Sequence, residues 1–348
     1  MKKNNLSNLP SLSIVIVTLN VEKKLAHALA SIEQQKYPRS KIEVLVVDGG
    51  STDGTLQLVK TSKLPIRIID GGFTDNQEAR RGVGLLQAKG EIVAYIDADN
   101  YLPHSLWLQK MVQPFLGYPD IVGTYTLRYS YRKNDTALNR YFSLLGSGDP
   151  VDHYLQKGER LSYLYDSWNR YGEIVSSDRD FFVVKFNINK FPTLGANGFL
   201  VRRSIWRKGF EKPSEYVHVD VPFNLAKKHY QLYGVVNDGI IHDTATTLAQ
   251  FLKKRVSYIL FYQHKIKNRS YKVFDYKNKE DVLHLFLFLF YSLTFIEPLI
   301  FSIRGFLKKR DSAWFIHPIY CFSVAIVYSL AFVTYIVMGR IKRNEGSS

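Results

Sequence analysis

Two carboxylates separated by one residue are the side chains in this chain whose type and spacing most directly suggest chemistry. Asp97 and Asp99 close the segment 90–99, in which an apolar run follows Gly90. An apolar run bounded by glycine predicts a buried strand, and open α/β sheets bind ligands in the crevice beyond their strand ends. Mg²⁺ is commonly held by one or two carboxylates plus substrate phosphates. The pair therefore predicts a metal–diphosphate site, with an ordinary turn after a strand as the alternative.

Further polar residues at the ends of earlier elements predict the rest of a ligand-binding site. Thr18 and Asn20 follow the first predicted strand, and Glu22 opens the next helix. Asp48 ends the second strand and is followed by two glycines, so it is able to hydrogen-bond a base or ribose while the backbone approaches closely. Arg80, one helix before the acidic pair, is expected to contact a diphosphate or an acid; exposure to solvent is the alternative.

The elements that must position these residues alternate between strands and helices. Strands are predicted at 14–17, 44–47, 66–69 and in the run that ends at 97; helices are predicted at 22–35, 55–60 and 78–88. Such alternation favours an α/β fold with a mostly parallel, Rossmann-like central sheet and helices on both faces. From 128 to 184 the regular pattern gives way to aromatic-rich polar sequence, which lines a groove or covers the sheet edge.

The motifs together resemble those of the family 2 glycosyltransferases, which have a GT-A fold. The matching stretches are 18–20, 47–55, 79–84 and 90–99, and their order and spacing follow the family over residues 12 to about 125 and more loosely to about 245. The resemblance implies an inverting transferase that uses a nucleotide-diphosphate sugar and Mg²⁺ or Mn²⁺. It implies that Asp48 contacts the nucleoside, that Asp97 is the first acid of the Asp-x-Asp motif, and that Asp99 touches metal and phosphates.

The second half of the chain matches this family less tightly. The acceptor-side segment of these enzymes is similar to Gly195, Ala196, Asn197 and Gly198. The family commonly has Glu-Asp further on, with the Asp as general base; here Asp220 is retained, but Val219 stands where Glu is expected. A positioned carboxylate suits deprotonation of an attacking hydroxyl. A helix cap is the alternative role for Asp220.

His242 follows another predicted strand and matches the place where GT-A enzymes use a further metal ligand. A hydrogen-bonded structural histidine is the alternative. The Gln-x-x-Arg-Trp signature of processive polysaccharide synthases is absent from 250–258, which argues against a polymerising synthase.

Composition favours a membrane surface as a partner. The 348 residues carry a net charge of +16, with Lys and Arg crowded after Lys227 beside apolar segments, and no common nucleic-acid motif is present. Membrane lipid is therefore expected as a partner and nucleic acid is not. Cys321 is the single cysteine, so a disulfide framework is excluded.

Two apolar segments are long enough to cross a membrane. Residues 318–338 contain no charge, whereas 282–303 are interrupted by Glu297 and Pro298, so this segment is expected to tilt, kink or re-enter. Buried core helices are the alternative. Basic residues lie before 281, in the link 304–310 and in the tail 340–343, and they favour conflicting topologies.

The predicted organisation is therefore a glycosyltransferase domain anchored to the cytoplasmic face of a membrane, with a lipid-linked saccharide or glycolipid as acceptor. The boundaries are a polar tail 1–11, a GT-A domain 12–245 with halves 12–125 and 126–245, a basic amphipathic interfacial segment 246–280, two membrane helices within 281–340 and a tail 341–348. Three rival functions are a polyprenyl-phosphate glycosyltransferase, a nucleotidyltransferase and an inactive membrane scaffold. The Gly-rich Lys/Arg loop expected of nucleotidyl transfer is absent after the first strand.

Overall fold

The computed structural model describes residues 8–158, 160–168, 172–244, 247–263 and 269–345. The chain forms two compact units, and each is made of two separate stretches of sequence. The first unit contains residues 1–130 and 170–243; the second contains residues 131–169 and 244–348. The predicted boundaries were continuous along the chain, so this division differs from them.

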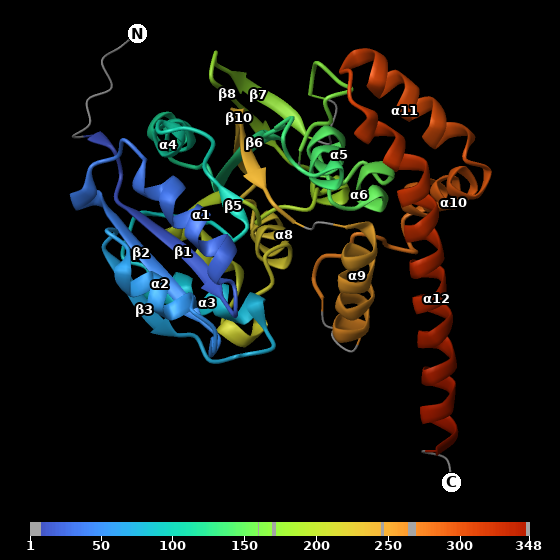
Figure 1. Cartoon of the computed structure of the whole chain (residues 1–348), viewed down its shortest axis with the longest axis horizontal. Helices are drawn as coiled ribbons and strands as arrows, with labels where there is room; N and C mark the ends of the chain where they lie inside the picture. Colours follow the sequence, from blue (N-terminus) through green and yellow to red (C-terminus); the bar gives the residue numbers. More distant parts are fainter. Residues whose placement is uncertain (1–7, 159, 169–171, 245–246, 264–268, 346–348) are drawn as a thin grey trace. The chain divides into compact units, whose positions relative to one another are not determined.

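A single mixed sheet runs through the first unit (Figure 1). Its path is β3-β2-β1-β4-β9-β6-β10-β8-β7, with β5 pairing with β10. The strands are β1 Leu12–Thr18, β2 Ile42–Asp48, β3 Ile66–Asp70, β4 Ile92–Tyr95, β5 Asn100–Tyr101, β6 Gly123–Tyr129, β7 Glu173–Ser177, β8 Phe181–Lys185, β9 Phe199–Arg202 and β10 Leu232–His242. The helices are α1 Glu22–Glu33, α2 Thr55–Thr61, α3 Gln77–Gln87, α4 Trp107–Gly117, α7 Arg203–Trp206 and α8 Asp220–Lys227.

The four strands predicted from apolar runs are present, and they pair in parallel as β3-β2-β1-β4. Beyond β4 the sheet is mixed rather than mostly parallel: β9 runs antiparallel to both β4 and β6, whereas β6 and β10 pair in parallel. The β7–β8 hairpin adds further antiparallel pairing next to β10. Apolar runs identify a buried strand but carry no sign of its direction, so the mixed character was not readable from them.

The prediction of helices on both faces of the sheet is confirmed in the packing. Alternate residues of β1 point to opposite faces. Ile14 and Ile16 share a core with Leu25 and Leu29 of α1, and with Trp107 of α4. On the other face α3 lies so close that a Cβ on Gly84 would stand 2.4 Å from Val15. Both faces of the parallel strands are therefore covered, and their ends remain available for a site.

The second unit is helical. Its helices are α5 Ala137–Leu145, α6 Pro150–Tyr154, α9 Leu248–Gln263, α10 Lys279–Thr294, α11 Ile296–Lys308 and α12 Ile316–Glu345. Aromatic side chains from residues 131–169 pack against the C-terminal helices in one core; examples are Tyr141 and Phe142 with Trp314 and Tyr320. Burial in this core, rather than the lining of a groove or the cover of a sheet edge, thus accounts for these aromatic residues.

The C-terminal apolar segments form one long helix and one bent pair. Residues Ser312–Ala331, mostly in α12, are long and apolar enough to cross a membrane by length and composition. The other segment breaks at Phe295, whose φ is +60°, and α10 and α11 meet there at 84°. The break was expected at Glu297 and Pro298, but these residues lie in the first turn of α11, where proline is tolerated.

Candidate functional site

The register of the parallel strands brings the first predicted site residues to one edge of the sheet. Thr18 of β1 pairs with Asp48 of β2, which pairs with Asp70 of β3. β4 lies on the other side of β1 and ends at Tyr95, so Asp97 and Asp99 follow at the same carboxyl edge. This edge is where an open α/β sheet binds its ligand.

The Asp48 carboxylate organises the loop that follows its own strand. Oδ1 accepts hydrogen bonds from the hydroxyls of Thr18 (2.7 Å) and Ser51 (2.6 Å), and Oδ2 accepts from the backbone N–H groups of Gly50 (2.8 Å) and Ser51 (2.7 Å). Burial raises the pKa of Asp48, but these hydrogen bonds, led by those of Ser51, outweigh burial and lower it. If Asp48 also contacted a nucleoside, that contact would have to share a carboxylate oxygen that already accepts hydrogen bonds from Thr18 or the loop.

Asn20 joins the loops that follow the first two strands. Its side-chain oxygen accepts from the backbone N–H groups of Thr52 (2.8 Å) and Asp53 (3.3 Å), and its own N–H donates to the Ser51 hydroxyl at 3.0 Å. Its φ is +53°, a conformation that asparagine tolerates better than most residues. Glu22 lies beside the same loop, because a Cβ on Gly54 would stand 2.5 Å from its carboxylate. Both residues therefore shape the loop.

Arg80 is buried, so exposure to solvent is excluded for this side chain. Its Nη1 donates to the carbonyl oxygens of Phe73 (2.7 Å) and Thr74 (2.8 Å), and its Nε is buried without a hydrogen-bond partner. A Cβ on Gly49 would lie 2.6 Å from Nη1. The glycine after Asp48 is thus explained by the close approach of the Arg80 guanidinium.

Arg81, which the sequence reasoning missed, is the partner of Asp97. Its Nη2 donates to both carboxylate oxygens of Asp97 at 2.7 and 2.9 Å, and its Nη1 donates to Glu78 at 2.5 Å. Burial lowers the pKa of Arg81, but the charges of Asp97 and Glu78 outweigh burial and raise it. The available signal was the i,i+3 spacing of Glu78 and Arg81 on one helix, which places opposite charges side by side.

Glu78 also fixes the segment that leads into Asp220. Its two carboxylate oxygens accept from the backbone N–H and the ring Nδ1 of His218, both at 2.8 Å. Burial raises the pKa of Glu78, but the charges of His218 and Arg81 outweigh burial and lower it. Asp220 begins α8 two residues later and is buried. Asp97, Arg81, Glu78 and His218 therefore form one continuous network that ends next to Asp220.

The acceptor-side residues 195–198 approach the same region. A Cβ on Gly195 would stand 2.3 Å from the carbonyl oxygen of His218, and one on Gly198 would stand 2.2 Å from Ile240. Gly195 and Gly198 both have positive φ, +107° and +76°. These glycines are required by the packing of this chain on itself, and the half-buried Ala196 lies between them.

Asp99, His242 and Asn197 are brought together by β4, β9 and β10. Oδ2 of Asp99 lies 3.8 Å from Nε2 of His242, and both side chains are about one-fifth exposed, at 21% and 18%. The Tyr129 ring stacks on His242 with centroids 5.4 Å apart, and its hydroxyl accepts from Nδ2 of Asn197 at 3.0 Å. Asn100 completes the cluster by donating to Asn197 at 3.4 Å.

The cluster around Asp99 provides some of the ligands that a divalent metal ion needs. In the part of the chain that the structure describes, no three His, Cys, Asp or Glu side chains converge as a complete metal site. Asp99 and His242 nevertheless offer an oxygen and a nitrogen 3.8 Å apart, and donor phosphates commonly supply remaining ligands to Mg²⁺. The Asp97 carboxylate is engaged by Arg81. The pair Asp99 and His242 therefore fits a metal that the donor diphosphate completes.

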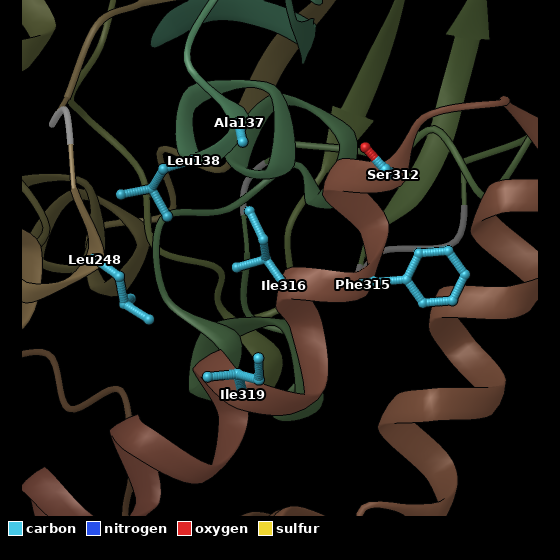
Figure 2. A pocket seen from close by; sticks show the side chains of 7 residues that line it. All are labelled: Ala137, Leu138, Leu248, Ser312, Phe315, Ile316 and Ile319. Carbon is cyan, nitrogen blue, oxygen red and sulfur yellow. The ribbon is translucent and has the colours of Figure 1, made fainter.

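A separate feature of the second unit is an apolar cavity of about 420 Å³ at the start of α12. Figure 2 shows the side chains that line it, which come from α5, α9, the residues just before α12 and the first turn of α12. They are Ala137, Leu138, Leu248, Ser312, Phe315, Ile316 and Ile319. Only one of the seven, Ser312, carries a polar side chain, so the cavity suits a hydrocarbon group.

Comparison with known proteins agrees with the expected family over the first half of the chain. Residues 13–168 match the family model described as glycosyl transferase family 2. Glycosyltransferase AglE of Haloferax volcanii is 35% identical over 141 residues, which are 39% of this chain and 46% of that protein. These matches confirm the prediction of a glycosyltransferase for the segment that they cover; the chain spans less than half the length of this relative.

Two further similarities extend over more of the chain. A GalNAc(5)-diNAcBac-PP-undecaprenol beta-1,3-glucosyltransferase of Campylobacter jejuni is 24% identical over 214 residues, 60% of this chain and 63% of that protein. Among solved structures, mannosyltransferase PcManGT of Pyrobaculum calidifontis, in complex with GDP-Man and Mn²⁺, has a TM-score of 0.49 at 16% identity. The superposition covers 92% of this chain and 87% of the mannosyltransferase.

Proposed function

We propose that this chain is an inverting, metal-dependent glycosyltransferase that moves a sugar from a nucleotide-diphosphate donor to a hydroxyl of a membrane-associated, lipid-linked acceptor. The observation that carries the proposal is the Asp99–His242 pair at the carboxyl edge of the sheet. It is supported by the family model that matches residues 13–168 and thus includes Asp48, Asp97 and Asp99.

The donor would lie along the edge formed by the ends of β1, β2 and β4. Asp48 and Asn20 hold the loop 49–53 in shape, and this loop would present its backbone to the nucleoside. Asp97, fixed by Arg81, would face the donor on the next strand. Asp99 and His242 would hold Mg²⁺ or Mn²⁺, which when bound neutralises the charge of the departing diphosphate.

Asp220 would act as the general base. A carboxylate that removes the proton of the acceptor hydroxyl makes that oxygen a better nucleophile. The oxygen then attacks the anomeric carbon as the bond to the nucleoside diphosphate breaks, and attack from the opposite face inverts the anomeric configuration. The network from Glu78 through His218 holds the segment before Asp220 in place, as a base that must reach one hydroxyl requires.

A lipid-linked acceptor and membrane attachment are supported by three observations. The Campylobacter jejuni relative is named for an undecaprenol-linked substrate. In this chain the second unit contains a helix long and apolar enough to cross a membrane, and the apolar cavity lies at its start. The basic residues after Lys227 favour contact with anionic lipid. We assign the catalytic unit to the cytoplasmic face, since Lys and Arg concentrate on that side.

The test uses full-length protein in detergent with a panel of nucleotide sugars, a lipid-linked acceptor and Mn²⁺. We expect one donor to be consumed, and NMR of the product to show the anomeric configuration opposite to that of the donor. Asp220→Asn should lower kcat with little change in donor KM, and Asp180→Asn, an exposed residue of the same unit, should behave as wild type. Retention of the anomeric configuration would contradict the proposal. Activity that survives Asp220→Asn would favour a phosphate acceptor, which needs no base.

A further inference from the structure

α10 and α11 expose many of their large apolar residues, although the apolar face of a helix in a water-soluble domain is normally buried. On α10 the exposed residues recur at helical spacing, and together with those of α11 we call them the outer stripe. The stripe consists of Val282, Leu283, Phe286, Phe290 and Leu293 on α10, and Ile296, Leu299, Ile300, Ile303 and Leu307 on α11. Each is between 44% and 66% exposed. Contiguous apolar surface of this extent marks contact with a membrane or a partner.

The opposite faces of the same helices are buried, and they combine polar or small residues with two phenylalanines, Phe288 and Phe301. Asp281 and Ser292 of α10 are 3% and 1% exposed, and Ser302 of α11 is fully buried, as is the helix face at Gly305. The Ser302 hydroxyl donates to the carbonyl oxygens of Pro298 and Trp314, at 2.9 and 2.8 Å. The pair is therefore held to the rest of its unit by a face that combines these hydrogen bonds with aromatic packing, and the outer stripe is left for an outside contact.

Neither helix is long enough to cross a bilayer alone. At 1.5 Å per residue, the 16 residues of α10 span about 24 Å and the 13 residues of α11 about 20 Å. The hydrocarbon core is about 30 Å thick. Because the two helices meet at 84°, they do not add up to one straight span.

Both ends of the pair are tied to the same stretch of chain, residues 131–169. At the start of α10, Asp281 binds the buried Lys157 at 2.6 Å. After α11, Asp311 accepts from Arg140 at 2.8 Å and from the hydroxyl of Tyr131 at 2.6 Å. Lys308 pairs with Asp166 at this same end. Since these partners are charged or polar residues of one compact unit, the two ends lie on one side of a membrane.

We infer that α10 and α11 form a re-entrant wedge that dips into one leaflet of a bilayer and returns to the side it left, so that α12 is the single crossing helix. The inference rests on the membrane attachment proposed above. The occupant of the outer stripe is the hydrocarbon of that leaflet. Basic residues flank the stripe at both ends, Lys277 and Lys279 before it and Lys308 and Arg310 after it, which suits anionic head groups.

The inference settles the conflict among the basic segments. The link with Arg304, Lys308, Lys309 and Arg310 stays on the cytoplasmic side together with the basic residues before Asp281. The smaller basic tail, with Arg340, Lys342 and Arg343, lies on the other side. The larger number of positive charges is then inside, as the positive-inside rule requires.

The test labels single cysteines with a membrane-impermeant maleimide, in full-length protein that carries Cys321→Ala. Three of the sites replace exposed residues: Lys277→Cys before α10, Arg310→Cys after α11, and Lys63→Cys in the first unit as the cytoplasmic reference. The fourth, Ser347→Cys, lies in the C-terminal tail of the sequence. We expect the first three to be labelled only in inside-out vesicles and Ser347→Cys only in right-side-out vesicles. Labelling of Arg310→Cys from the side opposite to Lys277→Cys would overturn the wedge, and labelling of all four from one side would overturn the crossing by α12.

A second experiment uses fluorescence quenching to determine whether lipid or protein covers the outer stripe. A fluorophore at Phe286→Cys should be quenched several-fold by lipids with a quencher on the acyl chain, whereas one at Lys277→Cys should not. Absence of quenching at Phe286→Cys would show that protein, for instance a second copy, covers the stripe, and would overturn the inference. Donor turnover by the same variants in detergent reports on the glycosyltransferase proposal separately, because neither labelling nor quenching depends on catalysis.

Discussion

Arg81 binds the buried carboxylate of Glu78 and the partly buried carboxylate of Asp97 at the carboxyl edge of the sheet, so its replacement is expected to lower the stability of the fold. Arg81→Ala leaves Asp97 and Glu78 without their shared cation, with side chains that are 13% and 6% exposed. Removal of one partner of a buried ion pair typically costs about 3–5 kcal/mol. We expect a fall of that size in the free energy of unfolding, measured by urea titration in detergent.

The matched control for Arg81 is Arg67→Ala, which breaks a partly exposed pair with Glu43 at 3.7 Å and a hydrogen bond to the Gln87 carbonyl oxygen. Exposed pairs contribute about 0–1 kcal/mol, so this variant should unfold close to wild type. Equal effects of the two substitutions would show that the Asp97 network does not support the fold.

Asp48 makes stability depend on pH in a direction fixed by its lowered pKa. A carboxylate whose folded pKa is depressed stabilises the fold above its unfolded pKa of about 3.9 and loses that contribution as pH falls through the folded value. Wild type should therefore exceed Asp48→Asn in stability at pH 7, and the difference should shrink below about pH 4. Thermal unfolding from pH 3 to pH 7 measures this. A difference that is constant with pH would mean that Asp48 acts through shape alone, and Asp120→Asn gives the baseline for an exposed acid.

At the scale of elements, the segment 195–198, for which an acceptor-side role is proposed, packs against His218 only because residue 195 is a glycine. Gly195→Ala introduces a Cβ at 2.3 Å from the His218 carbonyl oxygen, at a φ of +107°. Gly72→Ala also has positive φ, +52°, but meets nothing within 4 Å. Overpacking typically costs about 1–3 kcal/mol, so Gly195→Ala should lose that much more stability than Gly72→Ala, and transfer activity with it. Equal stability of the two variants in urea titrations would refute this account of the loop.

The elements that were predictable from sequence are those whose signal is local. Apolar runs located β1, β2, β3 and β4, and residues at the ends of β1 and β2 were correctly expected to meet at one edge. The position of β9 between β4 and β6 depends on pairing over about a hundred residues, and no local pattern encodes it. Arg80 and Arg81 are neighbours in sequence, and only the rotation of α3 against the sheet decides which of them reaches Asp97.

At the scale of the whole molecule, each unit is built from two separate stretches of the chain, and this changes the expected effect of a truncation. Residues 131–169 bury Leu138, Tyr141 and Phe142 against Trp314 and Tyr320. A chain that ends before Asp281 loses this cover and exposes the aromatic residues. We expect it to aggregate, whereas a chain that ends after Thr334 keeps the core and stays monodisperse in detergent. Size-exclusion chromatography distinguishes them; a monodisperse chain 1–280 would show that residues 131–169 fold without α10, α11 and α12.

The second unit joins two separate stretches of the chain, and local sequence patterns did not predict that these stretches pack together. Its N-terminal part alternates aromatic and charged residues, which reads as irregular surface when the partner helices are unknown. The C-terminal apolar segments were recognised from their length and scarcity of charge. Their buried faces pack on residues 131–169 largely through aromatic side chains and carry too few charges to signal a partner. The bend at Phe295 depends on a positive φ, which glycine or asparagine would have signalled and phenylalanine does not.

The central claim is that Asp99, with His242, supports metal-dependent use of a nucleotide-sugar donor. Its most direct test is the release of nucleoside diphosphate from the donor, measured with purified full-length protein at saturating donor and Mn²⁺. We predict release that stops on chelation, falls about 100-fold or more in Asp99→Asn, and is unchanged in the exposed-surface control Asp120→Asn. Release by Asp99→Asn at the wild-type rate, with the same metal dependence, would contradict the account.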